Sequence, residues 1–239
     1  MKVGYVQCAP VLGDVQVNID NVKRLLSQAE SANLIVLPEL CNCGYNFESR
    51  QQARDLSESI DDSVFVQFLG DICREKTQYI VAGLNERDGD RLYNTAVVVG
   101  PQGYIGKYRK LHLFMNEKDI FTPGDVGLPV FEIGECKIGV LICFDWIFPE
   151  VWRIPALKGA DIICHPSNLV IPGLAQRAVP IHALMNRVYV ITTNRYGTEG
   201  DLTFTGLSLI ADPTGNVLAE SPAVGDDVRI VDIDVQLAR

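Results

Sequence analysis

One stretch of the chain, residues 139–150, constrains the fold more than any other. The apolar run over residues 138–142 is typical of a strand buried on both faces, as in parallel sheets that helices cover. The strand is predicted to end at Cys143, and Pro149 starts the helix that follows. Because ligands bind at the carboxyl edge of open α/β sheets, Cys143 is a candidate site residue. The alternative is an inert core thiol, the usual state of a buried cysteine.

Composition narrows the class of protein and its partners. With 47% hydrophobic and 21% charged residues, the chain has an ordinary globular composition, and 239 residues are enough for one large domain. No apolar run approaches the roughly 20 residues that span a bilayer, and the N-terminus lacks a signal-peptide pattern. A net charge of −9 argues against nucleic acid and anionic membranes as partners. Seven irregularly spaced cysteines do not form a disulfide framework, so we expect a reducing, cytoplasmic setting.

Apolar periodicity and turn signals predict the order of strands and helices. Strands are expected over residues 2–7, 34–37, 79–85, 92–100, 104–107, 130–133, 137–143, 161–164, 189–193, 207–211, 216–220 and 228–232. Helices are expected over residues 17–32, after an N-cap at Ser63, and over 149–158 and 174–187. Residues 108–129 are expected to form a long loop, and a loop of that length in a compact domain is usually functional.

The chain contains a faint internal repeat. Residues 97–105 and 209–217 share the pattern of a strand, an x-Pro-x-Gly turn and a second strand. Each copy lies late in its half of the chain, so the pattern predicts two similar halves, each with a sheet and helices. No linker or low-complexity segment separates them, and we therefore predict a single domain over residues 1–239.

Three ionisable residues lie where apolar runs end or loops begin: Glu39, Lys110 and Cys143. A cysteine nucleophile needs a base for its proton and a donor for the developing oxyanion. Glu39 is suited to act as the base if burial raises its pKa, and Lys110 as the cationic donor. Taken singly, Glu39 is as consistent with a capping carboxylate and Lys110 with a solvated lysine, so the hypothesis depends on the three together.

Two other kinds of site were weighed against this set. A Cys143–His165 dyad is compatible with the spacing, since His165 also follows a predicted strand. Cys41 and Cys43 form a C-x-C without the second pair that a zinc site usually has, so metal binding is not expected.

Over essentially its whole length, the chain resembles the nitrilase, or carbon–nitrogen hydrolase, superfamily. Three motifs in this order and spacing carry the resemblance: Leu37-Pro38-Glu39-Leu40, Gly106-Lys107-Tyr108-Arg109-Lys110-Leu111-His112-Leu113 and Ile142-Cys143-Phe144-Asp145-Trp146-Ile147-Phe148-Pro149-Glu150. The resemblance implies an α/β fold, a four-layer α-β-β-α sandwich of two pseudo-symmetric halves. It also implies a catalytic Glu39-Lys110-Cys143 triad, with Glu117 as a second glutamate that positions Lys110 and the substrate.

The same resemblance implies a reaction that needs no cofactor. Cys143 would attack a small amide or nitrile to form a thioester, with the oxyanion held by Lys110 and the backbone N–H of Phe144, and water would release ammonia and a carboxylic acid. Family members commonly pair as dimers across helices like those starting near Pro149 and Leu174, and many continue beyond the position of Arg239 with a tail that reaches across the dimer. A homodimer or higher homo-oligomer is therefore expected.

Residues near the motifs suggest a largely apolar pocket that favours a small aliphatic amide. Tyr45, Phe144, Trp146 and Asn168 are the candidate substrate-binding residues, and further apolar walls are expected from Phe47, Phe114 and Leu169. Arg177 is the candidate cation if the substrate carries a carboxylate, as N-carbamoyl amino acids do. The alternatives are therefore an amidohydrolase of N-carbamoyl amino acids or amines, a Cys–His thiol hydrolase of peptides, and a catalytically silent binding module on the same fold.

Overall fold

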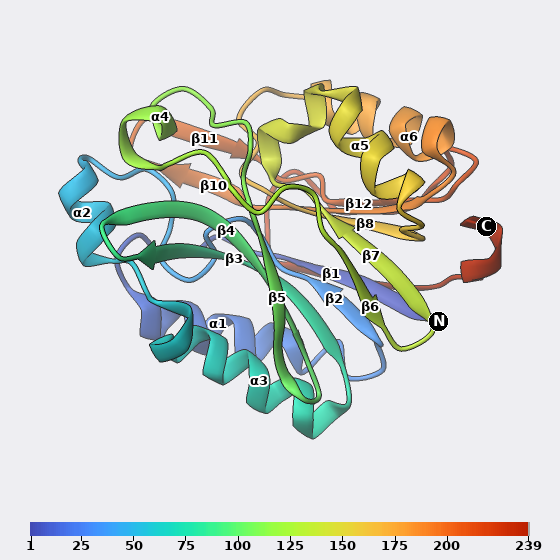
Figure 1. Cartoon of the computed structure of the whole chain (residues 1–239), viewed down its shortest axis with the longest axis horizontal. Helices are drawn as coiled ribbons and strands as arrows, with labels where there is room; N and C mark the ends of the chain where they lie inside the picture. Colours follow the sequence, from blue (N-terminus) through green and yellow to red (C-terminus); the bar gives the residue numbers. More distant parts are fainter. Residues whose placement is uncertain (239) are drawn as a thin grey trace.

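The computed structural model describes residues 1–238 and shows two six-stranded sheets, face to face between two pairs of helices (Figure 1). Helices α1 (Val15–Leu26) and α3 (Val64–Lys76) cover the outer face of the first sheet, and α5 (Pro149–Leu157) and α6 (Leu174–Asn186) cover that of the second. This is the predicted α-β-β-α sandwich. None of the helices in residues 1–238 combines the length and hydropathy that a membrane crossing requires.

The first sheet has the strand order β14-β1-β2-β3-β4-β5. Its strands are β1 (Lys2–Gln7), β2 (Leu34–Val36), β3 (Tyr79–Asp88), β4 (Arg91–Gly100), β5 (Gly103–Arg109) and β14 (Asp227–Asp232). β1, β2 and β3 run parallel, whereas β4, β5 and β14 join as antiparallel neighbours. The carboxyl ends of β2 and β5 therefore lie at the same edge of this sheet.

The second sheet has the order β13-β12-β9-β8-β7-β6. Its strands are β6 (Val130–Ile133), β7 (Cys136–Val140), β8 (Ile162–Ser167), β9 (Tyr189–Asn194), β12 (Leu209–Ala211) and β13 (Val217–Glu220). A separate hairpin of β10 (Tyr196–Glu199) and β11 (Leu202–Thr205) interrupts the chain between β9 and β12. The short helices are α2 (Arg50–Asp55) and α4 (Glu117–Ile120), with 3₁₀ turns η1 (Ile60–Asp62), η2 (Cys143–Ile147) and η3 (Val235–Ala238).

The two halves repeat one topology, as the internal pattern predicted. In each, three parallel strands are followed by two antiparallel ones: β1-β2-β3-β4-β5 in the first half and β7-β8-β9-β12-β13 in the second. The irregularities in the last hairpins also correspond, because the register shifts between Val98 and Val99 in one and between Ile210 and Ala211 in the other. These residue pairs occupy equivalent positions of the sequence repeat.

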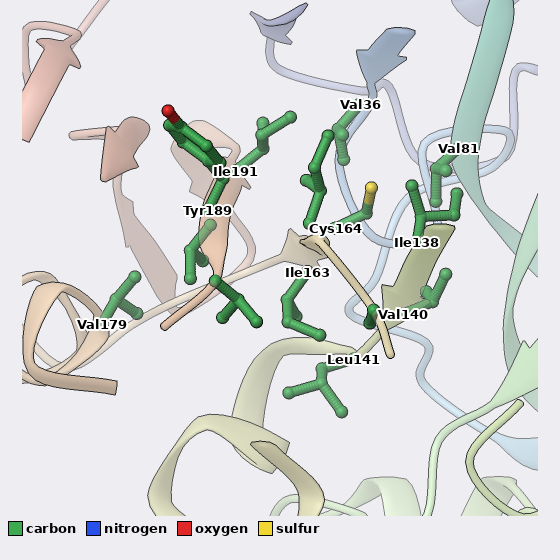
Figure 2. Packing of buried hydrophobic residues seen from close by; sticks show 14 of the residues in the cluster. Val36, Val81, Ile138, Val140, Leu141, Ile163, Cys164, Val179, Tyr189 and Ile191 are labelled. Atoms are coloured by element: carbon green, nitrogen blue, oxygen red, sulfur yellow. The ribbon is translucent and has the colours of Figure 1, made fainter. Parts of the chain in front are cut away.

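Strand alternation divides the core into layers, because successive side chains of a strand point to opposite faces. Leu34 and Val36 of β2 belong to the buried cluster shared with the second sheet, whereas Ile35 packs in the cluster under α1 and α3. Figure 2 shows the inner layer, in which Val36 and Val81 of the first sheet lie opposite Cys164 and other residues of the second. The carboxyl ends of the parallel strands in both sheets, where Glu39 and Cys143 follow β2 and β7, are supported by this packed double layer.

Two predicted boundaries were wrong. The helix expected over residues 17–32 is α1, which begins after Asp14 accepts a hydrogen bond from Val17 N and ends at Leu26. Beyond it, tighter turn bonds such as Ala29 N to Leu26 O redirect the chain toward β2. The strand expected over residues 137–143 ends at Val140, because the backbone N–H of Ile142 bonds to a carboxylate oxygen of Asp145 rather than to a neighbouring strand.

Four further segments differ from the predictions. The expected loop 108–129 begins later, since β5 continues to Arg109, and it contains the one-turn helix α4. Strand β8 does not end at Cys164 but runs through Ser167. The hairpin β10–β11 and helix α2 were not predicted at all. Arg239 lies outside the described residues.

Candidate active site

Glu39 lies in the loop that follows β2, and its side chain is completely buried. Its backbone is pressed against β3: a Cβ at Gly83 would lie 2.5 Å from the Cα of Glu39 and 2.2 Å from the backbone N of Leu40. Gly83 N also bonds to the carbonyl of Pro38 at 3.1 Å. Only glycine permits this close approach, so β3 fixes the position of the Glu39 backbone.

Lys110 follows β5 directly, and its ammonium group lies between two carboxylates. Its Nζ is 2.7 Å from Oε1 of Glu39 and 2.7 Å from Oε1 of Glu117. The lysine backbone is held at both ends, since its N–H donates to Asn94 O and its carbonyl accepts from Gly124 N. The side chain is therefore fixed by contacts at its backbone and at its charged end.

Glu117 is the first residue of helix α4, inside the segment that was expected to be a loop. Its second carboxylate oxygen accepts a 2.9 Å hydrogen bond from the backbone N–H of Phe114. Both oxygens of the Glu117 carboxylate thus have partners, one in Lys110 and one in the chain before the helix. The helix turn and this bond together orient the carboxylate toward the lysine.

Burial and charge shift the pKa values of these groups in different directions. Burial raises the pKa of Glu39, and the charge of Lys110 offsets that rise only in part. Burial alone would lower the pKa of Lys110, but the charges of Glu117 and Glu39 outweigh it and hold that pKa above its ordinary value. The lysine therefore stays protonated. The pKa of Glu39 moves toward neutral pH, as is required of a general base.

Cys143 opens the 3₁₀ turn η2, three residues after β7. Its φ is +43°, the left-handed region that non-glycine residues rarely adopt. His165 holds this turn: its Nε2 donates a 2.9 Å hydrogen bond to the carbonyl of Cys143, and its Nδ1 lies 3.0 Å from Thr192 Oγ1. Both ring nitrogens thus have partners other than the thiol, so the structure does not form the Cys143–His165 dyad considered from the sequence.

The Cys143 thiol lies within electrostatic reach of the other three residues. Burial raises its pKa well above the ordinary value, the charge of Glu39 adds to that rise, and the charge of Lys110 opposes it. A neutral thiol needs a base before it can attack. The structure thus brings Glu39, Lys110, Glu117 and Cys143 into one buried group of two carboxylates, an ammonium held between them, and a thiol.

Asp145 joins the cysteine turn to the segment that carries Lys110. Its completely buried carboxylate accepts hydrogen bonds from Ile142 N (3.0 Å), the Tyr108 hydroxyl (2.8 Å) and His112 N (3.2 Å), and one oxygen lies 2.8 Å from His112 Nδ1. The motif containing Asp145 was noted in the sequence, but no role followed from it. In the structure, its hydrogen bonds join the motif that contains Cys143 to the motif that contains Lys110.

Two hollows flank this group. The smaller, of about 20 Å³, is lined by Cys143 together with Phe144, Trp146, Asn168 and Leu169. The larger, of about 110 Å³, is lined by Glu117, Tyr45 and Phe47 and reaches Asp201 and Leu202 of the β10–β11 hairpin. Phe114 and Val170 line both hollows, so the two hollows lie next to each other. All four candidate substrate-binding residues therefore border the two hollows.

Other candidates lie elsewhere or have other partners. Arg177 is exposed on α6, donates to the carbonyl of Gly173 and borders neither hollow. Within residues 1–238, no group of three or more His, Cys, Asp or Glu side chains is arranged to hold a metal ion.

Asn94, whose role sequence reasoning missed, donates a 2.7 Å hydrogen bond to Oε1 of Glu39. Its signal was a polar residue just before the apolar run of residues 96–99 in β4.

Comparison with known proteins agrees with this geometry. The sequence matches the carbon–nitrogen hydrolase family over residues 2–239. A Pyrococcus abyssi protein named nitrilase is 49% identical over 241 residues, covering 100% of this chain and 92% of that protein. An (R)-stereoselective amidase from Pseudomonas sp. is 33% identical over 240 residues, covering 98% of this chain and 85% of the amidase.

The fold agrees as well. A solved amidase from Nesterenkonia sp. AN1, with acrylamide added to its active-site cysteine, has a TM-score of 0.85 and 25% identity, covering 100% of this chain and 95% of that one. The resemblance inferred from the three motifs is thereby confirmed. The chain belongs to the carbon–nitrogen hydrolase family and is a cysteine-dependent hydrolase of its nitrilase and amidase type.

Proposed function

We propose that this protein hydrolyses a small aliphatic amide or nitrile through a thioester on Cys143. One observation carries the proposal: Lys110 is held 2.7 Å from each of two buried carboxylates and lies close enough to Cys143 for its charge to act on the thiol. A salt-bridge network that served stability alone would not need a nucleophile beside it. The group supplies every element of covalent acyl transfer from the protein itself.

In the first half of the reaction, Oε2 of Glu39 takes the proton of Cys143, and the thiolate attacks the carbonyl carbon of an amide. The new C–S bond moves the carbonyl electron pair onto oxygen, and Lys110 and the backbone N–H of Phe144 stabilise that oxyanion. When the oxyanion collapses, the C–N bond breaks. Glu39 returns its proton to the leaving nitrogen, so that ammonia departs and a thioester remains.

In the second half, Glu39 removes a proton from water, and the resulting hydroxide adds to the thioester carbon. Collapse of the second oxyanion breaks the C–S bond, and the sulfur leaves as the thiol after taking the proton from Glu39. The sum is an amide plus water giving a carboxylic acid plus ammonia. A nitrile would enter as a thioimidate that a first water converts to the thioester. Each proton is carried by Glu39, so the cycle uses no cofactor.

The alternatives have less support. A Cys–His hydrolase would need His165 at the thiol, but its nitrogens face the Cys143 carbonyl and Thr192. An N-carbamoyl amino acid would bring a carboxylate, and among the described residues that border the two hollows there is no Lys, Arg or His. A silent binding module would have no reason to keep Glu39, Lys110 and Cys143 buried together.

We also propose a single domain over residues 1–239 that pairs as a homodimer. Support for one domain comes from β14, which pairs with β1 across the whole sequence, and from a site built by both halves. Support for a dimer comes from α5 and α6, which lie together and expose apolar side chains: Ile154, Leu157, Ile181, Leu184 and Met185. Six buried cysteines, Cys8, Cys41, Cys43, Cys73, Cys143 and Cys164, are free thiols, which favours a reducing, cytoplasmic compartment.

The test is ammonia release over a panel of short amides, nitriles and carbamoyl compounds, combined with mass spectrometry of the quenched enzyme. We expect release from aliphatic amides or nitriles and an acyl adduct on the peptide that contains Cys143. A matched variant, Cys164→Ala, removes another buried thiol and should keep both signals. Ammonia release without any adduct on Cys143, or turnover of carboxylate-bearing carbamoyl compounds alone, would contradict the proposal.

A further inference from the structure

We propose that the larger hollow receives the acyl chain of the substrate, that it selects a short uncharged chain, and that Leu202 on the β10–β11 hairpin sets the length. The proposal rests on the hydrolase function above and deepens it, because that function leaves open which amides are bound. Three observations carry it: the volumes of the two hollows, the charges that line them, and the way the hairpin is fastened.

The volumes divide the substrate between the hollows. The smaller hollow beside Cys143 measures about 20 Å³, which is close to the space of a single water molecule. It has room for the reacting carboxamide nitrogen or for the attacking water, and none for a chain. The larger hollow measures about 110 Å³. A cavity of roughly 150 Å³ lined by apolar groups holds benzene, so we expect the larger hollow to hold about four carbon atoms.

The lining of the larger hollow determines the chemistry of that chain. Most of its wall is apolar or aromatic, with Phe47, Phe114 and Leu202 among its residues. Its two ionisable carboxylates are Glu117, which already contacts Lys110, and Asp201 at the rim. A carboxylate on the substrate would therefore lose its water without gaining a cation, and it would face like charge. Such burial is strongly unfavourable.

The hairpin, which contributes Asp201 and Leu202 to the wall of the hollow, is fastened to the loop that contributes Tyr45 and Asn46. The Glu199 carboxylate accepts hydrogen bonds from the backbone N–H groups of Tyr45 (2.8 Å) and Asn46 (2.5 Å), and its other oxygen pairs with Arg195 Nη1 at 2.8 Å. The rings of Tyr45 and Phe204 meet edge to face at 5.8 Å. Because these contacts join the hairpin to the loop carrying Tyr45, Leu202 lies at a fixed distance from the reaction centre.

The internal repeat supports a role in specificity rather than in folding. In the first half, β3 is followed directly by β4, whereas in the second half the hairpin stands between the equivalent strands β9 and β12. β10 and β11 pair only with each other and belong to neither six-stranded sheet. The repeated fold is thus complete without the hairpin, which is free to vary with the substrate.

Binding constants test the proposal independently of turnover. In the Cys143→Ala variant, dissociation constants are measured by calorimetry for acetamide, propanamide, butanamide, pentanamide and hexanamide. We expect about fourfold tighter binding for each added methylene up to pentanamide, and weaker binding of hexanamide. Leu202→Ala should move the optimum to hexanamide, and Leu202→Phe should move it to propanamide. Thr203→Val, on an exposed neighbour in the hairpin, should leave the optimum unchanged.

A charged pair of equal length completes the test. Succinamate should bind at least 100-fold more weakly than 4-oxopentanamide, which replaces the carboxylate by a methyl ketone. If both Leu202 variants preferred the same chain length as the protein that retains Leu202, the proposal that Leu202 sets the length would be wrong. If succinamate and 4-oxopentanamide bound equally well, the proposal that the hollow selects uncharged chains would be wrong. If both preferences are observed but the protein that retains Cys143 releases no ammonia, the proposed hydrolase function is wrong and the binding proposal stands. The two failures are therefore distinguishable.

Discussion

The side-chain amide of Asn94 donates a 2.7 Å hydrogen bond to Oε1 of Glu39, the same oxygen that Lys110 contacts. The other oxygen, Oε2, is buried and has no hydrogen-bond partner within residues 1–238. A buried carboxylate oxygen without a partner is energetically costly, and such groups concentrate where a protein needs them for chemistry. Two donors on one oxygen thus leave the other for the thiol and for water.

Asn94 should therefore tune the basicity of Glu39. Its hydrogen bond, like that of Lys110, lowers the pKa of Glu39 against the larger effect of burial. Removing the bond in Asn94→Ala should raise that pKa further, because the carboxylate loses a donor that favours its charged form. The acidic limb of the kcat/KM profile should therefore move to higher pH. A lower plateau with an unmoved limb would mean that Asn94 only supports the fold.

Glu39 and Cys143 should both be indispensable to turnover. Cys143→Ala removes the nucleophile and should abolish ammonia release with the circular dichroism spectrum intact. Glu39→Gln keeps shape and hydrogen bonding but cannot take a proton, so turnover should fall by several orders of magnitude. Cys164→Ala is the matched thiol control. Loss of activity in Cys164→Ala alone would show that the nucleophile has been misassigned.

Lys110 should act through its charge. Because Glu117 and Glu39 keep it protonated, it can stabilise both the thiolate and the oxyanion at a buried position. Lys110→Met should lose about 3 kcal/mol or more of transition-state stabilisation, measured as kcat/KM on the best amide. Lys110→Arg should not restore full activity, since a planar fork cannot replace a compact ammonium. A folded Lys110→Met enzyme within about tenfold of the unmodified protein would assign the oxyanion to other donors.

His165 should make stability depend on pH. Burial lowers its pKa from 6.5 to about 4. Between these values the unfolded chain binds a proton that the folded chain does not, so the free energy of unfolding falls as pH falls through this window, by about 3 kcal/mol in all. Measured by urea unfolding between pH 7 and pH 4.5, the free energy of unfolding should fall less in His165→Gln than in the unmodified protein. Carboxylates contribute equally to both proteins, so identical slopes would exclude this role for His165.

The proposed dimer should be sensitive to charge on α5. Leu157 is 78% exposed on the apolar face that α5 and α6 share. Leu157→Glu should shift the mass measured by light scattering from dimer to monomer, because an interface cannot bury an unpaired carboxylate cheaply. Val224→Glu is the control, since Val224 is 73% exposed outside these helices. A monomeric unmodified protein, or a dimer that survives in Leu157→Glu, would exclude this face.

The parts of the fold that the sequence predicted are those that local patterns determine. Apolar runs, such as those of β2, β7, β8 and β9, and turn signals, such as residues 88–90, predicted all twelve strands of the two sheets, although several boundaries differ. The ends of two such runs led to Glu39 and Cys143. Lys110 and Glu117 are different, because nothing in their polar loop sequence separates them from solvated residues. Lys110 was a candidate only in combination with Glu39 and Cys143, and Glu117 was singled out only by resemblance to the family.

What the sequence could not show depends on distant contacts. Asp145 receives bonds from Tyr108 and His112, both more than 30 positions away, and Asn94 meets Glu39 across 55 positions. The hairpin β10–β11 was missed because its strands have only four residues each and are half-exposed, so neither shows a clear alternation. Arg195 and Glu199 are buried as an ion pair, and Glu199 also accepts bonds from the backbone N–H groups of Tyr45 and Asn46. A hydropathy pattern reveals none of these partners.

The pairing of β1 with β14 has a consequence for how the protein is made. The first strand to leave the ribosome has its antiparallel neighbour at residues 227–232, and the N-terminal ammonium group contacts Asp232 across 231 positions. At a synthesis rate of about 5–20 residues per second, roughly 10 to 50 seconds pass between the synthesis of β1 and that of β14. Throughout translation, one edge of the first sheet therefore stays open to other chains. Nascent protein should depend on chaperones during this interval, and fusions that delay release of β14 should aggregate most.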